Sequence, residues 1–162
     1  MSKVINIVGY SSNVGKTLLI ENLIKELKSR GYSIATIKHD VHGFDIDKKG
    51  KDTYKHREAG AETVVISSKN RFAMIKELNE EIEFNDIIKL LLDKDIILVE
   101  GYKNSNLRKI EVYRSGVSDK IITPKEKLIA VASDIELNLD GVLEVNINDY
   151  KSLANIVEEI DL

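Results

Sequence analysis

The chain has 162 residues, a formal net charge of -3 and no cysteine, and its length predicts a single domain over residues 1–162. The lack of cysteine excludes a disulfide scaffold, a thiolate zinc site, an iron–sulfur cluster and a cysteine nucleophile. The mild acidity argues against nucleic-acid binding, and without a long apolar run or a signal peptide we expect a cytoplasmic protein with no membrane span.

Strand-like and helix-like segments alternate from the beginning of the chain. Residues 4–8 form a short run that includes Asn6 and is rich in β-branched residues, as expected of a buried strand. From Lys16 onward the apolar residues recur at helical spacing, and Gly31 is a suitable stop for that helix. Residues 33–37 are typical of a strand again. Because strand, helix and strand follow one another so closely, we expect these two strands to be parallel.

Shorter elements are expected beyond residue 40. The run over 96–99 is the most hydrophobic strand, which predicts an interior place in the sheet. The other predicted elements are a helix over 52–59, a hairpin over 63–67 and 71–75, a helix over 87–92, strands over 110–113, 128–132 and 142–147, and a final helix capped by Asp149. This order predicts an α/β fold with a mostly parallel sheet and helices on both faces.

The sharpest motif, Gly9-Tyr10-Ser11-Ser12-Asn13-Val14-Gly15-Lys16-Thr17, lies between the first predicted strand and the first predicted helix. In that context backbone N–H groups and the helix dipole can hold phosphate. Lys16 would face the β and γ phosphates, and the Thr17 hydroxyl is suited to Mg²⁺. The predicted nucleotide-binding residues are Gly9, Ser11, Ser12, Asn13, Val14, Gly15, Lys16, Thr17 and Leu18.

The spacing departs from the usual G-x-x-x-x-G-K-[ST]. Counting back from Gly15, the first glycine is expected where Tyr10 stands, and Gly9 comes one residue earlier. Either the loop is one residue longer than usual, or Tyr10 occupies the first position. An ordinary glycine-containing turn is the alternative to a phosphate loop.

Acidic residues follow two of the predicted strands. Glu100 ends the run over 96–99, so it can meet Thr17 at the carboxyl edge of the sheet and ligate Mg²⁺ there, or merely cap the strand. Asp45 and Asp47 are further candidates for Mg²⁺, directly or through water. The predicted catalytic residues are Lys16, Glu100, Asp45 and Asp47, with Arg57 as a candidate arginine finger. His39 and His42 are interpreted as residues of a solvated loop.

Taken together, these motifs resemble the B-protein family of molybdopterin-guanine dinucleotide biosynthesis. The resemblance spans nearly the whole chain. It rests on Gly15-Lys16-Thr17, Ile37-Lys38-His39, Asp45-Ile46-Asp47, Gly50-Lys51-Asp52-Thr53-Tyr54, Arg57-Glu58-Ala59-Gly60-Ala61, Val99-Glu100-Gly101-Tyr102-Lys103, Lys109-Ile110-Glu111-Val112-Tyr113-Arg114 and Ala130-Val131-Ala132-Ser133-Asp134.

The resemblance implies a P-loop NTPase-like fold and a cytoplasmic homodimer that binds GTP with Mg²⁺ and hydrolyses it weakly. It implies a partnership with the molybdopterin guanylyltransferase, and it leaves open whether molybdopterin touches this chain. The alternatives are a P-loop kinase of a small metabolite and a non-hydrolysing adaptor with a degenerate nucleotide site.

The choice of base depends on the resemblance, since no Asn-Lys-x-Asp motif is present. Asp134 follows the predicted strand over 128–132 at the appropriate edge of the sheet. Its carboxylate is a candidate acceptor for the guanine N1–H and N2–H, and the alternative is that it caps the strand or the next turn.

Overall fold

The computed structural model describes residues 2–160. Within that range the chain forms two compact units. The first unit comprises residues 2–39 and 90–160, and the second comprises residues 40–89. The phosphate-loop motif and Glu100 belong to the first unit, whereas Asp45 and Asp47 belong to the second.

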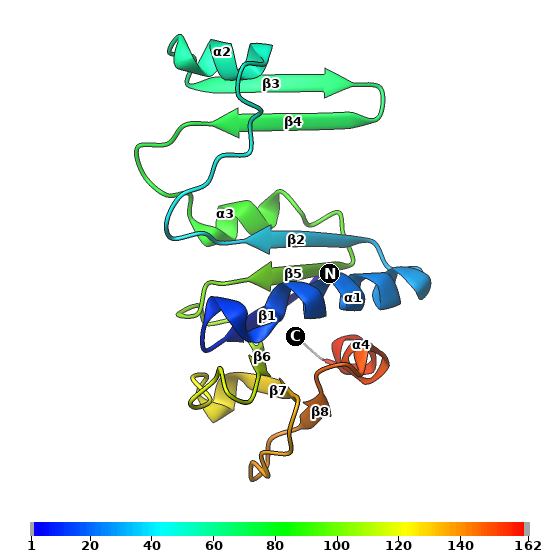
Figure 1. Ribbon diagram of the computed structural model, residues 1–162. Coiled ribbons are helices and arrows are strands. Elements are labelled where there is room, and N and C mark those ends of the chain that lie inside the picture. Colours follow the sequence, from blue (N-terminus) through cyan, green and yellow to red (C-terminus); the bar gives the residue numbers. More distant parts are fainter. Residues whose placement is uncertain (1, 161–162) are drawn as a thin grey trace. The chain divides into compact units, whose positions relative to one another are not determined.

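The first unit is built on a six-stranded sheet with the strand order β2-β5-β1-β6-β7-β8 (Figure 1). Every neighbouring pair in it is parallel, so the carboxyl ends of all six strands share one edge. The strands are β1 (Lys3–Gly9), β2 (Ile34–Lys38), β5 (Ile96–Glu100), β6 (Lys109–Tyr113), β7 (Leu128–Ser133) and β8 (Glu144–Asn146). The predicted parallel sheet is confirmed, and β5 lies inside it with residues 96–99 all buried.

Two helices of this unit, α1 (Lys16–Ser29) and α4 (Tyr150–Glu159), lie beside each other (Figure 1). Their apolar residues share one core cluster with alternate residues of β1, β5 and β6 and with three residues of β7. Arg30, just after α1, donates to Glu158 on α4 at 2.6 Å and so joins the two helices at their ends. None of the helices in residues 2–160 is long and apolar enough to cross a membrane.

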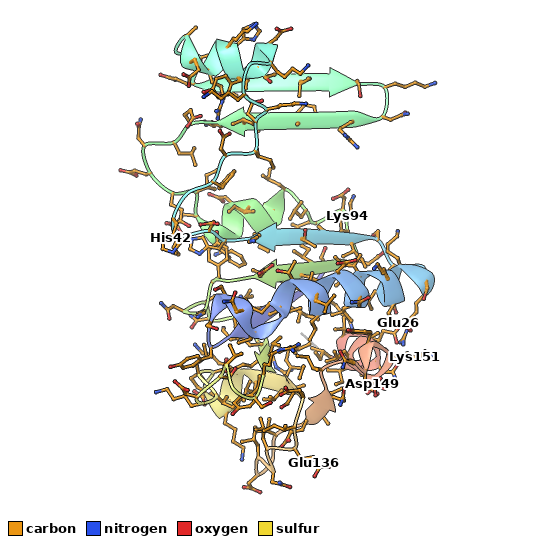
Figure 2. All side chains as sticks on the ribbon, in the orientation of Figure 1. Glu26, His42, Lys94, Glu136, Asp149 and Lys151 are labelled. Carbon is orange, nitrogen blue, oxygen red and sulfur yellow. The ribbon has the colours of Figure 1, made fainter. Side chains whose placement is uncertain are left out.

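The helix boundaries follow the signals in the sequence. Gly31 has φ +94°, a left-handed conformation that ends α1 where the sequence predicts. Asp149 lies at the beginning of α4 (Figure 2) and its carboxylate accepts from the Ser152 N–H at 3.0 Å. Both predicted caps are therefore confirmed, and they fix the length of the helices that cover the sheet.

Two buried charged side chains, Lys109 and Glu111, lie on the face of β6 opposite the core cluster. The Lys109 ammonium donates to the carbonyls of Ser105 and Leu107 at 2.7 and 2.8 Å. The Glu111 carboxylate accepts from the backbone N–H groups of Ile122 and Thr123, each at 2.8 Å. These bonds hold the two loops around β6 against the sheet. They also pair buried polar groups that would destabilise the fold if they had no partners.

The second unit contains an antiparallel hairpin of β3 (Thr63–Ser68) and β4 (Arg71–Lys76). The predicted hairpin is confirmed, but Ser68 pairs with Arg71, so each strand is one residue longer than predicted and only residues 69–70 form the turn. Helix α2 (Asp52–Glu58) contacts β3. Helix α3 (Phe84–Lys89) begins three residues before the predicted start at 87. The N–H groups of Asp86 and Ile87 both donate to the Glu83 carbonyl, so the first turn of the helix lies ahead of the apolar residues from which its start was predicted.

Candidate functional site

The structure decides which glycine opens the phosphate loop. Gly9 is the last residue of β1, and a Cβ there would lie 2.5 Å from Val14 Cγ2 and 3.0 Å from the Val112 carbonyl. Only glycine fits that position, whereas the Tyr10 hydroxyl reaches outward and donates to Asp119 at 2.7 Å. The loop is therefore one residue longer than usual, with residues 10–14 between the two glycines.

The end of the loop is shaped for an anion. Residues 12–14 form a short 3-10 turn, and Gly15 adopts φ +97° directly before α1. The N-cap residue Gly15 has no side chain that could accept from the first turn of α1, so those N–H groups can donate to another acceptor. With fourteen residues behind it, the helix dipole adds positive potential at the same place.

Lys16 is the central cation of the site. The residue is only 7% exposed, and its ammonium donates to the Ser11 carbonyl at 2.6 Å, back across the loop. Burial lowers the pKa of Lys16, the nearby Glu100 carboxylate raises it, and the charges of Lys103 and Lys38 lower it further. A phosphate would relieve this crowding of positive charge.

The structure brings Thr17 and Glu100 together, as the strand-edge argument predicts. Thr17 Oγ1 lies 3.4 Å from Glu100 Oε1. Glu100 ends β5, which is the direct neighbour of β1 in the sheet, and Lys38 on β2 is its register partner on the other side. A hydroxyl and a carboxylate oxygen so placed are the ligands that Mg²⁺ takes beside a phosphate loop.

Gly101 is required by the close approach of a neighbouring strand end. It has φ +95°, and a Cβ there would lie 3.1 Å from His39 Cβ. The His39 N–H donates to the Glu100 carbonyl at 2.9 Å, and the His39 ring stacks on Tyr102 with centroids 4.2 Å apart. His39 thus supports the segment that carries Glu100. Among residues 2–160, no three His, Cys, Asp or Glu side chains are grouped as a metal site.

Two basic residues that sequence reasoning missed lie against the phosphate loop. Lys103 Nζ donates to the Tyr10 carbonyl at 3.0 Å, and Arg114 Nε donates to the Val14 carbonyl at 3.3 Å. Both follow strands that flank β1, at the edge where that strand ends. Their position after β5 and β6 was a signal available in the sequence, since parallel strands bring their following residues together.

Asp134 follows β7 at the same edge, where the sequence places it, and its carboxylate already has partners. Oδ1 accepts from the Ser115 N–H and Oδ2 from the Ser115 hydroxyl, each at 2.8 Å. The bond from the Ser115 N–H is the main cause that lowers the pKa of Asp134. A hollow of about 430 Å³ adjoins this residue and is lined by both β7 and β8.

Asp45 and Asp47 form their contacts inside the second unit. Arg57 Nε lies 3.3 Å from Asp47 Oδ2, and a second guanidinium nitrogen lies 3.7 Å from Asp45 Oδ1. The same guanidinium donates to Glu77 at 2.9 Å. Arg57 therefore pairs with three carboxylates of its own unit, and these ion pairs order the segment before α2.

A parallel sheet with a glycine-bounded loop between its first strand and helix, and with an acid on the neighbouring strand, defines a P-loop nucleotide-binding protein. A sequence model of molybdopterin guanine dinucleotide synthesis protein B matches residues 4–134. The chain belongs to that family.

Relatives and solved structures agree with this assignment. The molybdopterin-guanine dinucleotide biosynthesis adapter protein of Escherichia coli K12 is 40% identical, with 91% of this chain and 87% of the relative covered. The protein of the same name from Haemophilus influenzae is 33% identical, covering 95% and 86%. A crystal structure of molybdopterin-guanine biosynthesis protein B is 25% identical with a TM-score of 0.71, covering 96% and 97% of the two chains. MobB of Bacillus subtilis shares the fold, with a TM-score of 0.78 over 98% of each chain.

Proposed function

We propose that this chain binds GTP with Mg²⁺ and acts as an accessory protein in the synthesis of molybdopterin guanine dinucleotide. The observation that carries the proposal is the meeting of Thr17 and Glu100 beside Lys16, at the uncapped N-terminus of α1. The relatives are named as adapter proteins of that synthesis, which supports the accessory role. The comparisons give no support to the alternative of a small-metabolite kinase.

The residues of the first unit fit a bound nucleotide. Loop N–H groups and the Lys16 ammonium would hold the phosphates, and Thr17 with Glu100 would hold Mg²⁺, which neutralises charge on the β and γ phosphates. Glu100 would also orient a water for slow hydrolysis. We expect turnover to be slow, as the family resemblance implies.

Calorimetric titration with GTP, GDP and ATP in the presence of Mg²⁺ tests this proposal. Lys16→Ala removes a charge that would face phosphate at close range, and we expect it to weaken GTP binding at least about thirtyfold. Lys25→Ala is the matched control, because Lys25 lies on the same helix and its exposed side chain pairs with the exposed Glu21. Equal GTP affinity in the wild type and in Lys16→Ala would refute the assignment.

We propose further that the cytoplasmic homodimer implied by the family resemblance forms through the hairpin. One face of the hairpin presents Val65, Phe72 and Met74, each more than half exposed. An isolated two-stranded hairpin is at best marginally stable in water, and a second copy would cover this apolar strip. Sedimentation should show a dimer for the wild type and a monomer for Phe72→Asp, with Lys69→Asp at the hairpin turn as the control. A dimer that survives Phe72→Asp would place the interface elsewhere.

The partner enzyme is the guanylyltransferase that joins GMP to molybdopterin, as the family resemblance implies. The assay is the rate of dinucleotide formation by that enzyme with and without this chain. We expect the wild type to raise the rate and Lys16→Ala to raise it less. No change in rate with the wild type would refute the accessory role while leaving nucleotide binding intact.

A further inference from the structure

Residues 114–119, which we call the clasp, contact the phosphate loop from one side. Arg114, at the beginning of the clasp, donates to the Val14 carbonyl at 3.3 Å. Its guanidinium also lies 3.2 Å from the point where a Cβ on Gly15 would stand. Asp119, at the end of the clasp, accepts from the Tyr10 hydroxyl at 2.7 Å. The clasp therefore contacts both ends of the lengthened loop.

The clasp is itself fixed by Asp134. Ser115 donates its N–H and its hydroxyl to the two carboxylate oxygens of Asp134, each at 2.8 Å. Inside the clasp the Arg114 N–H donates to Ser118 Oγ at 3.2 Å, and Ser118 is buried. Hydrogen bonds to an ionised acceptor are among the stronger ones in proteins. Asp134 thus holds the residue next to Arg114 in place.

This arrangement bears on how the base is selected. A carboxylate that recognises guanine accepts from two adjacent donors, N1–H and N2–H, with one oxygen each. The two donors of Ser115 are also adjacent, and they take one oxygen each in the same forked manner. Ser115 therefore occupies the edge of Asp134 that a guanine would need.

We propose that Asp134 is a positioning residue that fixes the phosphate loop through Ser115 and Arg114, and that it does not select the base. The inference rests on the proposed function, because it concerns nucleotide bound in that loop. Loss of the two hydrogen bonds from Ser115 to Asp134, which we call the fork, releases the clasp. The contact of Arg114 with the loop then loosens as well. The affinity then lost is that of the loop for the phosphates, which all nucleoside triphosphates share.

The test compares GTP, inosine triphosphate and xanthosine triphosphate, each with Mg²⁺, by calorimetry on the full chain. We expect Asp134→Asn to weaken binding of all three by roughly tenfold, since a neutral amide oxygen accepts from the Ser115 N–H more weakly than the carboxylate does. Arg114→Gln should have a similar effect, and the double variant should be scarcely weaker than either single variant, because both changes act through one contact. Asp140→Asn, on an exposed turn, is the matched control and should leave all three affinities unchanged.

The outcomes separate this inference from the proposed function. If Asp134→Asn weakens GTP alone and strengthens xanthosine triphosphate, Asp134 reads the base and the inference is wrong. Unchanged affinities in Asp134→Asn, or losses that add fully in the double variant, would also overturn it. If the wild type binds none of the three, the proposed function fails, and that result precedes any variant. Asp134 is exposed, so the variant is expected to fold, and Ser115→Ala provides a second way to open the fork.

Discussion

Substitution of Gly9 by alanine tests the structural basis of the lengthened loop without any ligand. The added methyl would lie 2.5 Å from Val14 Cγ2 and 3.0 Å from the Val112 carbonyl. Val14 is fully buried, and the Val112 backbone is held in β6, so neither neighbour has free space to move into. Overpacking of this kind costs about 2–3 kcal/mol, which lowers the Tm of a chain of this size by roughly 4–12 °C.

A double-mutant cycle isolates the clash. Val14→Ala alone should cost about 2 kcal/mol, because it removes two buried carbon atoms. It also removes Cγ2 and leaves Cβ at 3.6 Å from the new methyl, which is ordinary contact. We therefore expect the double variant to lose about 1–2 kcal/mol less free energy of unfolding than the sum of the losses in the two single variants.

The free energy of unfolding is measured in urea by far-ultraviolet circular dichroism. Val157→Ala, a buried valine on α4, is the control partner and should add to Gly9→Ala without coupling. Full additivity with Val14→Ala would mean that Gly9 does not touch Val14. The reasoning that makes Gly9, and not Tyr10, the first glycine of the loop would then be refuted.

Two further predictions concern other parts of the first unit. Glu111→Gln replaces an acceptor with a donor opposite a backbone N–H, so it should lower the free energy of unfolding by about 1–3 kcal/mol, whereas the exposed Glu136→Gln should not change it. Asp149 has its pKa lowered below the ordinary 3.8, first by the Ser152 N–H and then by its hydroxyl. Its carboxylate therefore stabilises the fold above pH 3.8 and ceases to do so as pH falls through the lower folded value. Urea titrations should show Asp149→Ala less stable than the wild type at pH 7, with a difference that shrinks in acid; a constant difference would contradict the role of the charge.

The sequence was informative where a local signal and a global one agreed. The β-branched residues of β1, the helical spacing after Lys16 and the caps at Gly31 and Asp149 are local, and the structure confirms each. The meeting of Thr17 and Glu100 followed from one topological rule, that parallel strands end at one edge. That rule needs no side-chain geometry, which is why it worked from residue types alone.

Other features depended on contacts that no short segment encodes. The spacing left open whether Gly9 or Tyr10 opens the loop, because the answer lies in the distance to Val112 on another strand. The clasp was missed because Arg114 and Asp119 sit in an irregular segment whose shape is set by the distant Asp134. The start of α3 was misplaced because acidic residues resemble a solvated connection as much as a first helical turn.

The position of β1 between β5 and β6 has a consequence for the order of events during synthesis. Lys3 is in register with Ile96, and Asn6 with Lys109, so the first strand made has both of its neighbours in the second half of the chain. At about 5–20 residues per second, a ribosome would need roughly 5–20 s to deliver them. Until then the nascent chain has no parallel sheet to support the loop between Gly9 and Gly15. A chain that terminates before Ile96 would carry the whole phosphate-loop sequence without either strand that pairs with β1.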